Sequence, residues 1–278
     1  MKSLTQHITE KLVLNNNAKV KKHQFNYHPK TFDELKKTVK KLIKERGNDA
    51  NLNDIDVSEI TDMSELFKKS KFNGDISEWD VSNVKNMESM FETSEFNGDI
   101  SNWDVSNVEN MEAMFQYSGF VGDIGKWDVS SVTNMHAMFA NTKFNGDISE
   151  WDVSNVEKMS GMFALSIFNR DISKWNVSKV NCMTGMFIHS KFNGDISEWN
   201  VSKVESMANM FYCSQFNRDI SKWNVSNVED MEGMFESSEF NQNISNWNIK
   251  KDCSTDIMFN NCPIKKEFKP HLKPQYNE

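Results

Sequence analysis

The same 24-residue pattern recurs along most of the chain, with no insertion or deletion between copies. One copy begins at Phe72 and the next at Phe96. A fixed period of this size is typical of a solenoid, in which one unit cannot bury its apolar face without its neighbours. The repeat therefore predicts an elongated stack of coils. One phenylalanine and one tryptophan recur at fixed positions of the repeat. The phenylalanine returns as Phe120, Phe144, Phe168, Phe192, Phe216 and Phe240, and the tryptophans are Trp79, Trp103, Trp127, Trp151, Trp175, Trp199, Trp223 and Trp247.

Within each copy, the spacing of apolar residues predicts a strand followed by a helix. The apolar residues of 76–84 follow the spacing of leucine-rich repeats, whose core is a short strand. Those of 84–91 recur every three or four residues, which is one stripe of a helix, and Ser82 or Asn83 can serve as its N-cap. The predicted fold is α/β, a leucine-rich-repeat-like solenoid of 24-residue strand–helix coils with a helical N-terminal cap.

A longer helix is predicted before the repeats. Thr31-Phe-Asp-Glu34 reads as a capping box, apolar residues follow at helical spacing through Glu45, and Gly47 is a suitable stop. A terminal repeat needs a cover with one polar face, so this segment is predicted to close the stack. Four regions result: a leader or linker with a possible targeting peptide at 1–21, an N-terminal cap of strand and helix at 22–50, the repeat solenoid at 51–262, and a C-terminal tail at 263–278.

Charge is divided unevenly along the chain. Residues 1–50 hold 12 Lys and Arg against 5 Asp and Glu, a net +7, whereas residues 51–250 hold 15 against 31, a net −16. An acidic rod does not suit nucleic acid, because phosphate binding needs basic groups. The chain contains no run of eighteen apolar residues, so no membrane span is predicted. The chain shows neither a secretory signal nor a lipobox, which favours a cytoplasmic or phage-particle location over classical export.

No residue pattern in the chain indicates catalysis. The six histidines lie in different segments and phases, and no nucleophile stands beside a base. Methionines at the phases of Met87 and Met90 are better explained as adaptable core filling than as haem or metal ligands. The four cysteines, Cys182, Cys213, Cys253 and Cys262, show no CxxC pairing. We therefore expect a protein that is not an enzyme and has no cofactor.

Two aspartate phases are candidates for function. The aspartates that recur at the position of Asp75 are predicted to cap turns with their carboxylates, and cation binding is the alternative. The phase of Asp80 holds Asp in the first half of the rod and Asn in the second. Charged residues also recur two positions earlier, at the position of Glu78. Together the two sets predict an outward strand face, which is where solenoids bind partners. The predicted partner-binding residues are Glu78, Asp80, Asp104, Lys126, Asp128, Glu150, Asp152, Lys174, Asn176, Glu198, Asn200, Lys222 and Asn224.

The repeat resembles a known bacterial surface-protein repeat of about 25 residues, which occurs in mycoplasma lipoproteins and in leucine-rich-repeat surface proteins of the BspA type. The resemblance rests on Phe-Asn-Gly-Asp-Ile-Ser-x-Trp-Asp-Val-Ser-x-Val-x-Asn-Met-x-x-Met-Phe, as it stands from Phe72 to Phe91, and covers roughly residues 50–262. It implies a non-enzymatic repeat protein related to adhesins that bind host or matrix proteins.

Two functional hypotheses follow. The first is a rod that binds a protein partner, possibly a basic one, as an adhesin-like or host-interaction module. The alternative is a structural or packaged component of a large tailed-phage particle. It rests on residues 1–10, which are similar to short phage targeting peptides that a viral protease cuts after Glu in a (Leu/Ile)-x-Glu context. Ile8-Thr9-Glu10 fits that context.

Overall fold

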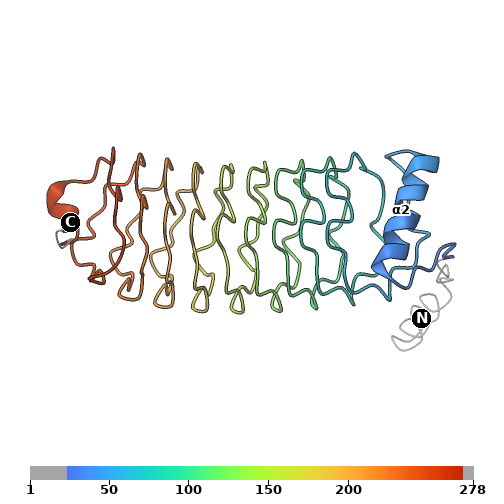
Figure 1. Ribbon diagram of the computed structural model, residues 1–278, viewed down its shortest axis with the longest axis horizontal. Helices are drawn as coiled ribbons and strands as arrows, with labels where there is room; N and C mark the ends of the chain where they lie inside the picture. The colour runs from blue at the N-terminus through green and yellow to red at the C-terminus, as the bar shows by residue number, and fades with distance from the viewer. Residues whose placement is uncertain (1–23, 272–278) are drawn as a thin grey trace, which may run out of the picture.

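The computed structural model describes residues 24–271 and shows a rod of stacked coils (Figure 1). Each coil is one 24-residue copy, and parallel bridges join residues of the same phase in neighbouring coils, such as Asn86 and Asn110. Helix α2 (Phe32–Arg46) lies across the N-terminal end, and the 3-10 helix η1 (Lys266–Phe268) lies at the opposite end. We call a set of residues 24 positions apart a column.

The predicted strand–helix coil is wrong. Within residues 24–271, α2 is the one α-helix, and ten isolated parallel bridges take the place of strands. Residues 84–91, predicted as a helix, instead follow tight turns. No strand forms within 76–84, where turns occupy Ser77 and Glu78 and then Ser82 and Asn83. The fold is therefore not an α/β, leucine-rich-repeat-like solenoid of strand–helix coils.

Residues 87–94 show how a coil is built instead. The N–H groups of Met87 and Ser89 donate to carbonyls of the next coil, with N···O distances of 2.9 and 2.8 Å. The N–H of Met90 turns back to the Met87 carbonyl at 3.2 Å. Ser89, the third residue of this turn, has a left-handed φ of 53°, as some tight turns require. Alternate N–H groups thus bond along the rod and within the coil.

Two columns of left-handed residues run the length of the rod. One column contains Ser89 and the other contains Thr93. Most residues in the two columns are not glycine; the glycines are Gly161, Gly185 and Gly233. A left-handed conformation costs a residue with a side chain roughly 1–2 kcal/mol. It persists here because hydrogen bonds to the neighbouring coil fix each turn.

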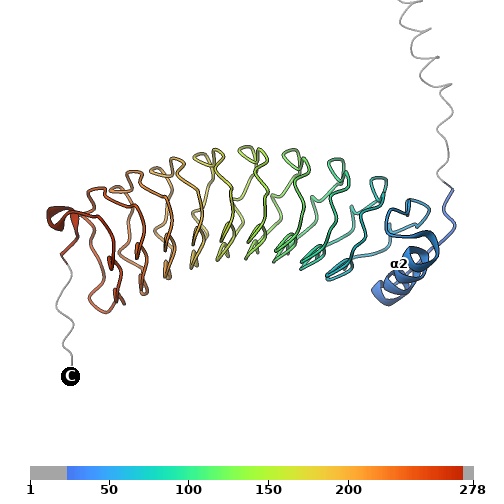
Figure 2. The same cartoon turned by 90° about the horizontal axis from the view of Figure 1, so that it is seen from above.

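The core is a stack of identical side chains. Met87, Met90 and Phe91 are fully buried. The Phe91 and Phe115 rings stack with centroids 5.7 Å apart, whereas the Phe96 and Phe120 rings are 6.5 Å apart. Stacked rings are therefore closer in the Phe91 column than in the Phe96 column. The rod as a whole is curved (Figure 2).

The tryptophans tie each coil to the one before it. All eight are buried, with at most 5% of their surface exposed. Each indole Nε1 donates to the carbonyl of a residue 27 positions earlier, as Trp151 does to Ile124 at 3.1 Å. The prediction that the indoles lie in the core is confirmed, and the Trp223 and Trp247 rings stack with centroids 6.4 Å apart.

The predicted N-terminal helix is present. Thr31 is the N-cap of α2, and its hydroxyl accepts the N–H of Glu34 at 3.3 Å. Leu35, Val39 and Leu42 are buried and join the core of the coils. Of the strand predicted at the start of the 22–50 cap, the described part contributes a single bridge, between Tyr27 and Ile55. The leader at 1–21, with its phage-type motif, and residues 272–278 of the tail lie outside the described residues.

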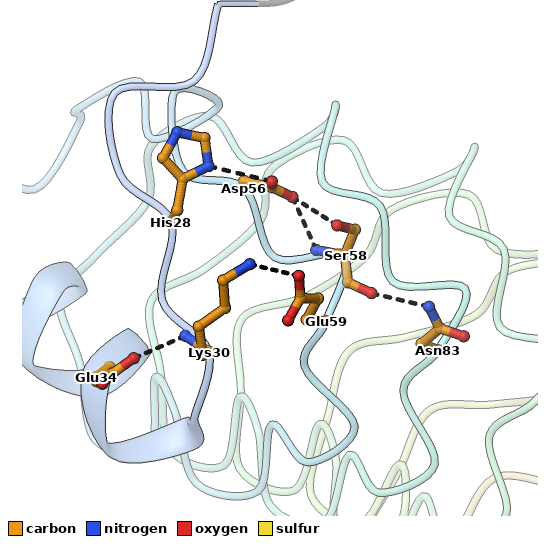
Figure 3. Close-up of polar contacts among 7 residues, drawn as sticks. All are labelled: His28, Lys30, Glu34, Asp56, Ser58, Glu59 and Asn83. Carbon is orange, nitrogen blue, oxygen red and sulfur yellow. Dashed lines mark hydrogen bonds and ion pairs between the residues drawn. The ribbon is translucent and has the colours of Figure 1, made fainter.

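Polar contacts join the segment before α2 to the first coil (Figure 3). His28 Nδ1 lies 3.2 Å from Asp56 Oδ2, and Lys30 forms an ion pair with Glu59. The backbone N–H of Lys30 also donates to Glu34 Oε2 at 2.7 Å. Basic groups of the cap region therefore meet acidic groups of the first coil.

Candidate functional site

The thirteen predicted partner-binding residues are all exposed on the coils. They occupy the columns of Glu78 and Asp80, on either side of the buried tryptophan column. We call these two columns the tryptophan-flanking face. The prediction that the residues belong to a strand is wrong, because no strand forms there. Their outward orientation follows from the burial of Trp79 between them.

The Asp80 column closes a turn in each coil from Asp80 to Asn224. Asp104 Oδ1 accepts the backbone N–H of Ser106 at 3.1 Å and its hydroxyl at 2.6 Å. Further along the rod, Asn176 Oδ1 accepts the N–H of Ser178 at 3.2 Å. Aspartate and asparagine thus make the same turn, and only the aspartate adds a negative charge.

The Asp75 column also caps turns, as predicted. Asp147 Oδ1 accepts the N–H of Ser149 at 3.0 Å, and Asp171 Oδ1 accepts that of Ser173 at 2.9 Å. Among residues 24–271, no three His, Cys, Asp or Glu side chains are grouped so that they could hold a metal ion. The carboxylates of this column therefore have a local structural role.

Charges along the tryptophan-flanking face change from one end of the rod to the other. In the second half, lysine and glutamate of adjacent coils pair: Lys174 Nζ lies 3.5 Å from Glu150 Oε1, and Lys222 Nζ lies 2.5 Å from Glu198 Oε1. The first half is more acidic, because it holds the aspartates of the second column: Asp80, Asp104, Asp128 and Asp152.

The structure shows a groove that we did not predict. It has a volume of about 520 Å³ and runs across several coils in the second half of the rod. Lys250 Nζ and Glu229 Oε1 pair across its wall at 2.6 Å. The available signal was Lys179 and Lys203, which stand where most earlier copies have asparagine. The lining residues are Glu157, Lys179, Asn181, Lys203, Glu205, Asn227, Glu229 and Lys250.

A second, basic hollow lies on α2 and is separate from this face. Its volume is about 460 Å³, and it is lined by Lys37, Lys40, Lys41, Lys44 and Glu45. The cap end of the molecule therefore presents the opposite charge to the first half of the tryptophan-flanking face.

Turn closure also changes the acidity of the aspartates. The hydroxyl and backbone N–H of Ser106 stabilise the charged form of Asp104 and hold its pKa below the usual value. Ser154 lowers the pKa of Asp152 in the same way. A carboxyl whose pKa is lower in the folded than in the unfolded chain stabilises the fold above its unfolded pKa of about 3.9. That stabilisation is lost as the pH falls through the folded pKa.

We therefore expect the rod to lose thermal stability as the pH falls below about 4. The double variant Asp104→Asn/Asp152→Asn should show a smaller acid-induced drop in melting temperature, because asparagine keeps the turn acceptor and does not titrate. Circular dichroism melts at about pH 7 and about pH 3 measure this difference. An Asp104→Ala/Asp152→Ala control should be less stable than the unmodified chain even at neutral pH. An equal acid sensitivity of the asparagine variant and the unmodified chain would contradict the role of these two carboxylates.

Comparison with known proteins places the chain in one family. The family model described as Mycoplasma protein of unknown function, DUF285, matches residues 33–143, 116–212 and 168–272. These matches cover most of the chain, so the protein belongs to this family of repeat proteins. No curated protein and no solved structure matches the chain. In the described part of the chain, no helix has the length and apolar character that crossing a bilayer requires.

Proposed function

We propose that the chain is a non-enzymatic protein-binding rod whose tryptophan-flanking face docks a partner with a basic surface. One observation carries the proposal: the turns of the acidic half can be closed without a negative charge. Asp104 and Asn176 close the same turn, with N···O distances of 3.1 and 3.2 Å. The negative charge at Asp104 is therefore available to a partner.

The scaffold suits this role because the inside of the rod is constant while its surface varies. Each coil within residues 72–239 buries the same tryptophan, methionine and phenylalanine columns. Exposed positions change from coil to coil, as in the column of Glu78, which also holds Lys126 and Glu150. A repeated core that carries a varied, extended surface is how repeat proteins bind partners. We extend the proposal to an adhesin-like or host-interaction role on the basis of the repeat's resemblance to surface proteins.

Charge should act mainly on the rate of encounter. Exposed charges are screened within about 8 Å at physiological salt, so they steer a partner toward the face more than they hold it there. Binding should weaken as salt rises, and it should depend on where the charges lie as well as on the net charge.

The test compares two variants with the same change in net charge. Asp80, Asp104, Asp128 and Asp152 are replaced together by Asn, which preserves the turns. In the control, Glu95, Glu232, Glu239 and Glu267, which are exposed outside the face, become Gln. Biolayer interferometry against a panel of lysine- and arginine-rich proteins should show association slowed about tenfold or more by the first change and little by the second. Equal slowing by both would mean that only net charge matters, and an unmodified chain that binds none of the panel would oppose a basic partner.

A further inference from the structure

The C-terminal end of the rod carries backbone donors of the kind that join the coils to one another. In every coil from that of Met63 to that of Met231, four alternate N–H groups donate to carbonyls of the next coil. The last coil has the same four N–H groups, and no group among residues 24–271 accepts a hydrogen bond from them. We call these four groups the donor row; they belong to Thr255, Ile257, Phe259 and Asn261.

The two ends of the rod are covered unequally. At the N-terminal end, α2 lies across the first coil and packs Leu35 and Leu42 against its core (Figure 1). At the C-terminal end, η1 and the residues before it continue the stack on another side of the coil, where the N–H of Ile244 donates to the Phe268 carbonyl at 3.0 Å. The described chain therefore leaves the donor row open. An open row of N–H groups is a template for pairing with another chain.

Apolar side chains of the same segment are also left open. Phe259 is only partly buried, although Phe235, whose ring stacks on it with centroids 5.9 Å apart, is fully buried. Ile257 is 52% exposed, whereas Ala113 and Ala137, in the same column, are 7% and 5% exposed. Inside the rod, a following coil covers these positions. A segment paired with the donor row would do the same at the end.

The charge of this end differs from that of the coil before it. Residues 250–271 hold five Lys against two Asp and one Glu, a net +2, whereas residues 226–249 hold five acidic residues and no basic one. Lys269 lies beside the donor row, because its Nζ is 5.1 Å from the centroid of the Phe259 ring. Charge complementarity at this end therefore favours an acidic partner.

We propose that the donor row binds an extended acidic segment of another protein, which adds one more parallel layer to the rod. Four N–H groups on alternate residues need carbonyls on alternate residues, and an extended polypeptide supplies them at that spacing. The coils of Met63 to Met231 each receive such carbonyls from the next coil. In this mode of recognition, backbone bonds provide affinity and side chains provide specificity. Apolar side chains of the partner would cover Ile257 and Phe259, and acidic ones would meet Lys269.

A second copy of the chain does not fit this end. Two C-terminal ends brought together would set one donor row against another, with no carbonyl to accept from either. In a head-to-tail stack, the acceptors would be carbonyls of the first coil, at the end that α2 covers (Figure 1). The occupant is therefore a different protein.

The test measures amide hydrogen exchange in the full chain by NMR, with a synthetic peptide as the probe. The peptide copies residues 228–239, which hold five acidic residues and no basic one. Without peptide, the donor row should exchange fast, and the equivalent amides of Met231, Gly233, Phe235 and Ser237 should be protected, because they donate to the last coil. Peptide at about 1 mM should slow exchange of the donor row about tenfold, as a dissociation constant of about 100 µM requires.

Two pairs of controls separate charge from backbone pairing. A peptide with every Glu→Gln and Asp→Asn should protect the donor row several-fold less, and a scrambled acidic peptide should not protect it. In the chain, Ile257→Asp and Ile257→Asn both suit the left-handed φ of 49° at this position. Only the aspartate adds a negative charge, so it should weaken binding of the acidic peptide more than the asparagine does.

Four outcomes would overturn the proposal. Protection of the donor row without peptide would show another occupant: a second copy if it grows with protein concentration, or a segment of the same chain if it does not. No effect of about 1 mM peptide would show that the row does not bind extended segments. Equal protection by the scrambled or the uncharged peptide would show that neither sequence nor acidity is recognised.

Discussion

Replacing Trp151 by alanine should lower the free energy of unfolding by about 3–5 kcal/mol, because it empties a large site in the core. Trp151 is 4% exposed, and its Nε1 donates to the Ile124 carbonyl at 3.1 Å. The variant loses both the packing and this link between coils. Because each coil contacts only its neighbours, the rod should then unfold in two steps, one for each side of the defect. Chemical denaturation followed by circular dichroism measures both effects.

The control Trp151→Phe keeps an aromatic ring but removes the donor. Its cost should be smaller, because the Ile124 carbonyl also accepts the backbone N–H of Trp127 at 3.1 Å and so keeps one partner. A loss below about 1 kcal/mol for Trp151→Ala would show that the indole contributes little to the core. It would then also be available as a binding surface.

Leu42→Ala should destabilise the N-terminal end of the rod by about 2–5 kcal/mol. Leu42 is fully buried where α2 covers the first coil. The effect should be local, since stability in a stacked array passes between nearest neighbours. Hydrogen exchange should become faster in α2 and in residues 48–71 and stay unchanged near Trp199.

The matched control is Lys40→Ala, on the exposed face of the same helix. Alanine has a high helix propensity, so this change should be close to neutral. If Leu42→Ala accelerates exchange along the entire rod, the coils unfold as one cooperative unit, and the nearest-neighbour description does not hold.

Much of the architecture could be predicted because buried positions repeat without variation. Phe91 and Trp151 are in the core, as their phases indicate. The signals for α2 are local: Thr31 caps it and Gly47 ends it, and both work as expected. Amphipathic spacing with clear caps leaves few alternatives for a segment of that length.

The path of the coil was predicted wrongly because two structures share one apolar pattern. Met87, Met90 and Phe91 all point inward, whether the segment is a helix or a run of tight turns. The difference lies in the left-handed residues between and after them, such as Ser89 and Thr93. Glycine would have revealed such positions, but the columns contain mostly residues that seldom adopt a positive φ. Hydrogen bonds between coils, which apolar spacing does not encode, decide the outcome.

The candidate face was located correctly as an exposed surface but was given the wrong local structure. Asp80-Val-Ser82 and Asp75-Ile-Ser77 have the same spacing, and in both the aspartate accepts the N–H of the serine. We predicted a turn only for the second. The groove lined by Lys179 and Lys203 was missed because its walls come from different coils.

The direction of the bonds between coils has a mechanical consequence. The N–H of Met87 reaches the Asn110 carbonyl along the axis of the rod, as its equivalents do in the other coils. Tension applied to the two ends would pull directly along these bonds and load all the coil junctions at the same time. Junctions in series open singly, so the rod should peel apart coil by coil at low force and lengthen by one repeat at each step. Such a rod yields to stretching gradually and does not break all at once.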